Sequence, residues 1–90
     1  MLLAIDVGNT NMVLGVFQGE ELLGSLRLKT DANRTSDEIG LLICQYFQRF
    51  GLSLEDVRDV VIGSVVPQVM YSLTSAIIKY VGKTPLIIDD

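Results

Sequence analysis

Residues 6–11 have side chains and a spacing that suit phosphate binding. An apolar run leads into a carboxylate, Asp6, which is followed by a glycine, three small polar residues and a second apolar run. This pattern predicts a strand, a tight turn and a second strand. The turn would offer backbone N–H groups to phosphate oxygens, and the carboxylate would hold magnesium through its water shell. We therefore treat this hairpin as a candidate site for a magnesium-bound polyphosphate.

A purely structural account of the same residues stays open on spacing alone. An aspartate that caps the turn after it is common, and asparagine and glycine are ordinary hairpin residues. Ser64 presents a similar choice, because it ends a predicted strand just before Pro67 opens a helix. Its hydroxyl is placed either to cap that helix or to contact a ligand at the edge of the sheet. For Thr-Ser-Asp-Glu at residues 35–38, helix capping is favoured over contact with a ligand, because capping explains the whole pattern.

The composition indicates one small soluble globular domain. The 90 residues are 49% apolar and 20% charged, with a net charge of −4 and no run of Lys or Arg. We therefore expect neither a nucleic-acid partner nor a membrane partner. No signal peptide or apolar run of about 20 residues is present, which favours a cytoplasmic location.

The residue types present in the chain exclude several kinds of catalytic and metal-binding site. The chain has no histidine and a single cysteine, Cys44. A zinc site or a histidine-dependent triad cannot be built from these residues, so oxygen ligands remain for a metal. We expect Cys44 to be a small buried side chain in a helix. Glycine-rich signatures of Rossmann and Walker nucleotide sites are absent from the sequence.

Apolar periodicity predicts the element order β-β-β-α-β-α-β. Residues 2–7 form a nearly continuous apolar run, which is typical of a central strand covered on both faces. We expect antiparallel strands at residues 12–17 and 22–29, and further strands at residues 57–62 and 85–88. Helices are predicted at residues 36–50, ending at Gly51, and at residues 67–81, ending at Gly82. The two strand-helix-strand crossovers imply parallel neighbours.

Three short motifs together resemble those of type III pantothenate kinases. They are Asp-x-Gly-Asn-Thr at residues 6–10 with a glycine at residue 15, Thr-Ser-Asp-Glu at residues 35–38, and Ser-Val-Val-Pro at residues 64–67. The Asp-x-Gly-x-Thr core alone is shared by the wider superfamily of actin, sugar kinases and heat-shock chaperones. Asn9 and the Ser-Val-Val-Pro segment point to the pantothenate kinase branch.

The resemblance implies a fold, a reaction and a set of ligands. Residues 1–90 would be the N-terminal ribonuclease H-like, actin-like ATPase domain, an α/β fold with a mixed sheet. The reaction would transfer the γ-phosphate of ATP to pantothenate, the first step of coenzyme A biosynthesis, with magnesium and a monovalent cation, potassium or ammonium. Asp6 would hold the hydrated magnesium. The nucleotide-binding residues would be Asp6, Val7, Gly8, Asn9, Thr10, Asn11, Met12 and Val13.

The resemblance also implies what these residues lack. The family's second domain, with the general base, most of the pantothenate site and the monovalent-cation ligand, would lie beyond Asp90, so no residue here is assigned as catalytic. We therefore expect the 90-residue chain alone to be inactive. The full-length protein would be a homodimer. The alternative is a non-catalytic nucleotide-binding, regulatory or actin-like module of the same superfamily.

Overall fold

The structure is a five-stranded sheet with two main helices. It is a computed structural model that describes residues 1–64 and 66–88. In chain order the elements are β1 (Leu2–Val7), β2 (Asn11–Gln18), β3 (Glu21–Lys29), α1 (Ser36–Phe50), the 3-10 turn η1 (Leu54–Asp56), β4 (Asp59–Gly63), α2 (Pro67–Ala76), the π-helical turn η2 (Ile77–Val81) and β5 (Leu86–Ile88). The predicted β-β-β-α-β-α-β order is confirmed.

The sheet is mixed, with strand order β3-β2-β1-β4-β5. The first three strands form an antiparallel meander, while β4 and β5 run parallel to β1. One expectation about neighbours was wrong, because the crossover through α1 carries the chain from β3 to β4, which pairs with β1 instead of β3. β3 is an edge strand whose one neighbour among the described strands is β2, and β4 joins the far side of β1, so the crossover through α1 passes over both β2 and β1. As a result β1 lies at the centre of the sheet.

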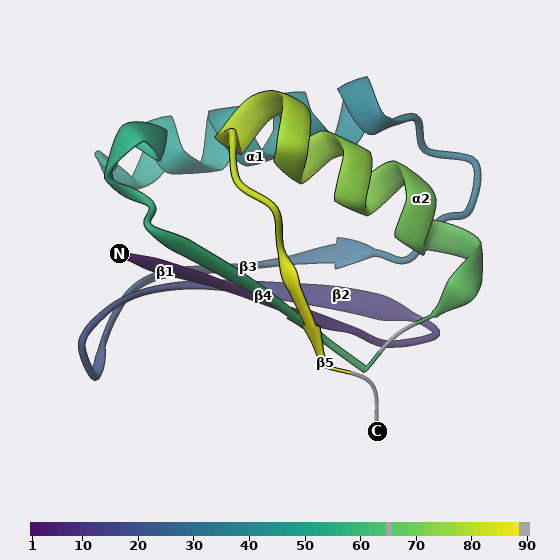
Figure 1. Ribbon diagram of the computed structural model, residues 1–90, viewed down its shortest axis with the longest axis horizontal. Coiled ribbons are helices and arrows are strands. Elements are labelled where there is room, and N and C mark those ends of the chain that lie inside the picture. The colour runs from purple at the N-terminus through teal and green to yellow at the C-terminus, as the bar shows by residue number, and fades with distance from the viewer. Residues whose placement is uncertain (65, 89–90) are drawn as a thin grey trace.

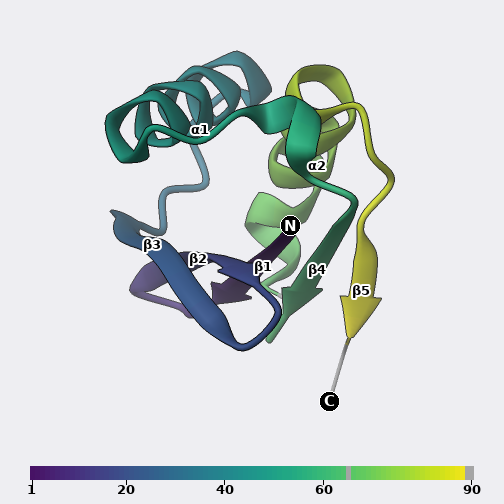
Figure 2. The ribbon, with the colours of Figure 1, turned by 90° about the vertical axis from the view of Figure 1, so that its left-hand side faces the viewer.

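Both main helices cover the same face of the sheet (Figures 1 and 2). Side chains of β1, β2, β4, α1 and α2 meet between the two layers and form the core. Its most buried members include Leu3, Ile5, Met12, Ile39, Ile43, Ile62, Leu73 and Ile77. The expectation that β1 is covered on both faces was wrong for the described residues. The residues of β1 alternate between buried and more exposed, and Ala4 and Asp6 lie on the uncovered face.

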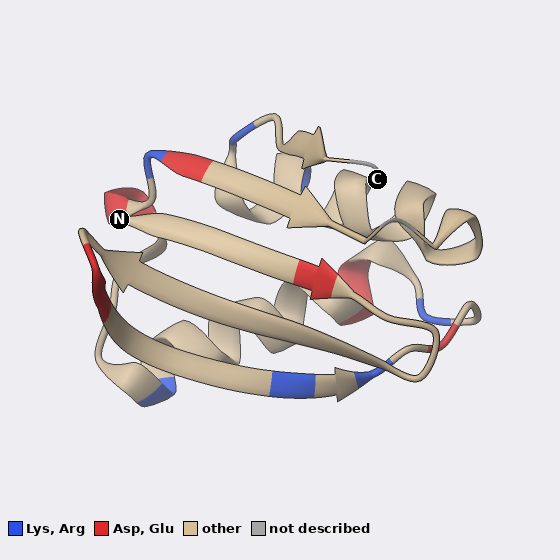
Figure 3. Cartoon of the chain, turned by 90° about the horizontal axis from the view of Figure 1, so that it is seen from below, with Lys and Arg blue, Asp and Glu red and all other residues tan. Residues whose placement is uncertain are grey.

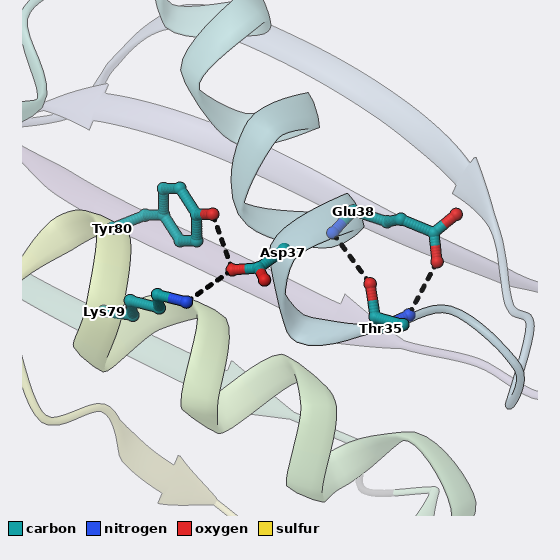
Figure 4. A network of polar contacts seen from close by, with 5 residues as sticks. All are labelled: Thr35, Asp37, Glu38, Lys79 and Tyr80. Carbon is teal, nitrogen blue, oxygen red and sulfur yellow. Dashed lines mark hydrogen bonds and ion pairs between the residues drawn. The ribbon is translucent and has the colours of Figure 1, made fainter.

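Helix α1 begins and ends as its sequence predicts. The Thr35 hydroxyl accepts a hydrogen bond from the Glu38 N–H, and the Glu38 carboxylate accepts one from the Thr35 N–H (Figure 4). This capping box satisfies two N–H groups at the start of the helix. It also lowers the pKa of Glu38, chiefly through the backbone hydrogen bond from Thr35. Gly51 ends the helix in the left-handed conformation with φ 71°.

The end of the second helix docks onto the start of α1. The helix predicted at residues 67–81 divides into α2 and the wider turn η2, which carries Lys79 and Tyr80. Both side chains donate hydrogen bonds to one Asp37 oxygen, at 2.6 and 2.7 Å (Figure 4). These donors, Lys79 first, hold the pKa of Asp37 below its usual value. The Tyr80 ring lies against Gly40, where no Cβ intervenes.

Cys44 is partly exposed, so the expectation of a buried thiol was wrong. Its neighbour in the chain, Ile43, points into the core with 1% of its surface exposed. Successive residues of an α-helix differ by about 100° around its axis, which turns Cys44 away from the sheet.

Replacing Gly40 by Ala tests the packing of Tyr80 on α1. An added methyl group would overlap the Tyr80 ring, so we expect the single variant to lose about 1–3 kcal/mol of stability. In a Tyr80→Ala background the overlap is gone, and the same change should stabilise the helix by up to about 1 kcal/mol. Chemical denaturation of the four proteins measures both values. An equal loss in both backgrounds would contradict this packing.

Candidate functional site

The turn between β1 and β2 is narrow and closes on itself. The Gly8 N–H donates a hydrogen bond to the Asn11 carbonyl at 2.9 Å, which leaves Asn9 and Thr10 at the tip. Both tip residues are exposed. A Cβ at residue 8 would lie 2.9 Å from the Asn11 carbonyl oxygen, closer than real Cβ contacts. Glycine is therefore needed at this position by the close approach of the two backbone segments.

Asp6 lies at the carboxyl end of β1, directly before this turn. In the sheet it pairs with Val13 of β2 on one side and with Gly63 of β4 on the other. Its side chain is exposed on the face that no helix covers. Figure 3 looks onto this face, where most of the strand surface is neither acidic nor basic.

A shallow hollow of about 440 Å³ lies on the open face beside Asp6. Small residues make room for it, because Ala4, Gly15 and Gly63 bring little or no side chain to the surface. Its remaining lining comes from Ile5, Asp6, Val13, Phe17, Leu22, Ser25 and Val61. Asp6 is the only carboxylate in this lining. The arrangement places one carboxylate at the margin of a mostly apolar and otherwise uncharged surface.

The eight predicted nucleotide-binding residues differ in which of their groups are accessible to a ligand. Val7 and Met12 point into the core, so only their backbone is available to a ligand. Val13 is partly buried opposite Asp6. The exposed polar groups belong to Asp6, Asn9 and Thr10. The residues do lie together in one hairpin, with Asp6 at its base and the turn at its end.

Ser64 does not cap the second helix. The N-cap of α2 is Val66, without a side-chain hydrogen bond, and Pro67 opens the helix as predicted. Ser64 is exposed and has φ 55°, in the left-handed region that non-glycine residues seldom adopt. It follows Gly63, the residue that pairs with Asp6. Of its two predicted roles, the capping role is therefore excluded, and contact with a ligand stays a prediction. Val65 lies outside the described residues.

The donor set suits a hydrated magnesium ion. Among residues 1–64 and 66–88, no group of three or more His, Cys, Asp or Glu residues could hold a metal by itself. Magnesium keeps several waters and is commonly held by one or two carboxylates together with substrate phosphates. The single exposed carboxylate of Asp6, directly before the turn at residues 8–11, fits that mode of binding.

Thr30 belongs to the same site but was not identified from the sequence. It follows β3, and its hydroxyl donates a hydrogen bond to the Gly8 carbonyl at 2.7 Å. Its N–H donates to the Thr10 carbonyl at 2.8 Å. The only sequence signal was a small polar residue at the end of a strand, which many turns share.

The comparison with known families decides the assignment. The model of the type III pantothenate kinase family matches residues 2–90. The chain belongs to this family. A type III pantothenate kinase from Bifidobacterium animalis subsp. lactis is 49% identical over 88 residues, which are 98% of this chain and 35% of that protein. One from Bifidobacterium longum subsp. infantis is 46% identical over the same length.

Solved structures confirm the actin-like ATPase fold expected for a type III pantothenate kinase. A ROK hexokinase from Thermus thermophilus superposes with a TM-score of 0.70 at 16% identity, over 99% of this chain and 33% of that one. A Bacteroides thetaiotaomicron protein described as having an actin-like ATPase fold gives 0.67 at 8% identity, over 97% and 32%. The chain spans about a third of the length of these relatives. No helix in the described residues is long and apolar enough to cross a membrane.

Replacing Gly8 by Ala tests the closure of the turn. The new Cβ would press on the Asn11 carbonyl, so we expect a loss of about 1–3 kcal/mol in stability and faster hydrogen exchange of the residue 8 amide. Gly63→Ala is the matched control, since nothing lies within 4 Å of its added Cβ. It should stay within about 0.5 kcal/mol of the wild type. Equal losses in the two variants would contradict the close approach at Gly8.

Proposed function

We propose that this chain forms the magnesium-ATP-binding part of a pantothenate kinase that converts pantothenate to 4'-phosphopantothenate, the first step of coenzyme A biosynthesis. One observation carries the proposal. Asp6 stands exposed at the base of the narrow turn at residues 8–11, in a chain that matches the type III pantothenate kinase model from residue 2 to residue 90.

In this proposal the hairpin positions the phosphates and neutralises part of their charge. Asp6 binds a water of the magnesium ion, and backbone groups of residues 8–13 line the β- and γ-phosphates. The exposed Ser64, which directly follows β4 and its Gly63, the partner of Asp6 in the sheet, contacts the same ligand. Phosphoryl transfer depends chiefly on such positioning and electrostatic stabilisation, because its transition state carries charge spread over the transferred oxygens.

The remaining parts of the reaction are assigned to residues beyond 90. These are the general base, most of the pantothenate pocket, the ligand of a potassium or ammonium ion, and the contacts of a homodimer. We infer a cytoplasmic location, which suits a soluble metabolic enzyme. The 90 residues by themselves bind magnesium-ATP but do not complete the transfer.

Asp6→Asn tests the proposal, with Asp59→Asn as its control. Both variants remove one exposed carboxylate from a strand, but Asp59 pairs with Leu2 at the opposite end of the sheet. Titration with ATP and magnesium should show Asp6→Asn binding about tenfold or more weakly than the wild type, while Asp59→Asn stays within about twofold. The difference should disappear when ATP is added without magnesium, because Asp6 acts through the metal.

Two results would contradict the proposal. One is a wild-type chain that does not bind magnesium-ATP. The other is an equal loss in both variants, which would indicate a general effect of charge. Phosphorylation of pantothenate by the 90-residue chain at rates typical of kinases, about 1–100 per second, would contradict the assignment of the base to later residues.

A further inference from the structure

We infer that Thr30 is a positioning residue, which orients the turn at residues 8–11 so that its N–H groups face the phosphates of the nucleotide. This inference rests on the proposed function, because it concerns how the same site is shaped. Thr30 lies 22 residues from Gly8 in the chain and directly follows β3, whereas Gly8 follows β1.

Thr30 holds the turn at two points. Its hydroxyl donates to the Gly8 carbonyl at 2.7 Å in a part-buried hydrogen bond. Its backbone N–H donates to the Thr10 carbonyl at 2.8 Å. The two carbonyls flank Asn9, so both ends of the tip are fixed from the side of β3.

These two hydrogen bonds determine where the N–H groups point. In a trans peptide the carbonyl of one residue and the N–H of the next point in opposite directions, and the described residues contain no cis peptide bond. Because the Gly8 carbonyl points at Thr30, the Asn9 N–H points away from it. The same reasoning turns the Asn11 N–H away from β3. Both donors therefore point away from Thr30.

The Gly8 carbonyl accepts a hydrogen bond from the Thr30 hydroxyl, whereas in a regular hairpin it would accept one from the Asn11 N–H. In a regular narrow pair, residues 8 and 11 would exchange two backbone hydrogen bonds. Across residues 1–64 and 66–88, the turn hydrogen bonds include the one from the Gly8 N–H to the Asn11 carbonyl, but not its reciprocal. The Asn11 N–H is thus left as a donor beside the tip, which suits a phosphate oxygen.

Thr30 is itself held in place on both sides. The preceding residue, Lys29, pairs with Asn11 in the β2–β3 ladder. After it, the Asp31 carbonyl accepts from the Arg34 N–H at 3.2 Å, and the Asp31 carboxylate accepts from the Asn33 N–H at 2.9 Å. Because Thr30 is held in place by its own neighbours, its hydrogen bonds can fix the orientation of the turn at residues 8–11.

Thr30→Val and Thr30→Ser form a matched pair that tests the hydroxyl. Valine keeps the shape and the backbone N–H but cannot donate from its side chain, whereas serine keeps the donor. We would titrate the wild type and both variants, each labelled with ¹⁵N, with magnesium-ATP and follow the amide signals. We expect Thr30→Val to bind about tenfold more weakly and to move the Asn9 amide signal before ligand is added. Thr30→Ser should bind within about twofold of the wild type.

The outcomes separate this inference from the proposed function. Failure of the wild type to bind magnesium-ATP would contradict both. Binding by the wild type that is unchanged in Thr30→Val, or equally weak in both variants, would contradict the role of the Thr30 hydroxyl alone. A purely structural role would lower the unfolding temperature of Thr30→Val and leave the affinity of the folded protein unchanged, which would also overturn the inference.

Discussion

The position of β1 between an antiparallel and a parallel neighbour determines where every residue of the candidate site lies. Its antiparallel pairing with β2 creates the turn after Asp6, and its parallel pairing with β4 brings Gly63 alongside that carboxylate. Carboxyl ends of parallel strands are where ligands of α/β sheets collect. In this chain the hairpin turn lies at the same edge. The turn proposed to bind phosphate and the carboxylate proposed to hold the metal are thus brought together by one arrangement of three strands.

The described helices cover only one face of the sheet, and this leaves Asp6 exposed on the other. The helices bury one face, while the other keeps small residues and a shallow apolar hollow that reaches Asp6. A carboxylate at the margin of such a surface remains in water and available to a hydrated cation. The chain spans about a third of the length of its relatives, and the general base of the proposed reaction is assigned to residues outside these 90 as part of that proposal.

Local features of the fold could be predicted from the sequence. The period of apolar residues indicated the strands and helices, and Thr35, Glu38 and Gly51 marked the ends of α1 because capping depends on near neighbours in the chain. Features that depend on distant contacts could not be predicted. The pairing of β4 with β1, the hydrogen bond from Tyr80 to Asp37 and the support of Gly8 by Thr30 join residues far apart in sequence. The sequence drew attention to Asp6 because its charge interrupts an apolar run, whereas Thr30 is one of several polar residues in a predicted loop and does not stand out.

The central claim is that magnesium and the ATP phosphates meet at the turn after Asp6. Manganese accepts the same oxygen ligands as magnesium, and as a paramagnetic ion it broadens the signals of nearby nuclei. We would add manganese and ATP together to the ¹⁵N-labelled chain and map the broadened amides. The account predicts the strongest broadening at residues 6–11 and at Gly63. Broadening centred on the acidic residues of α1, or spread evenly over the surface, would contradict it.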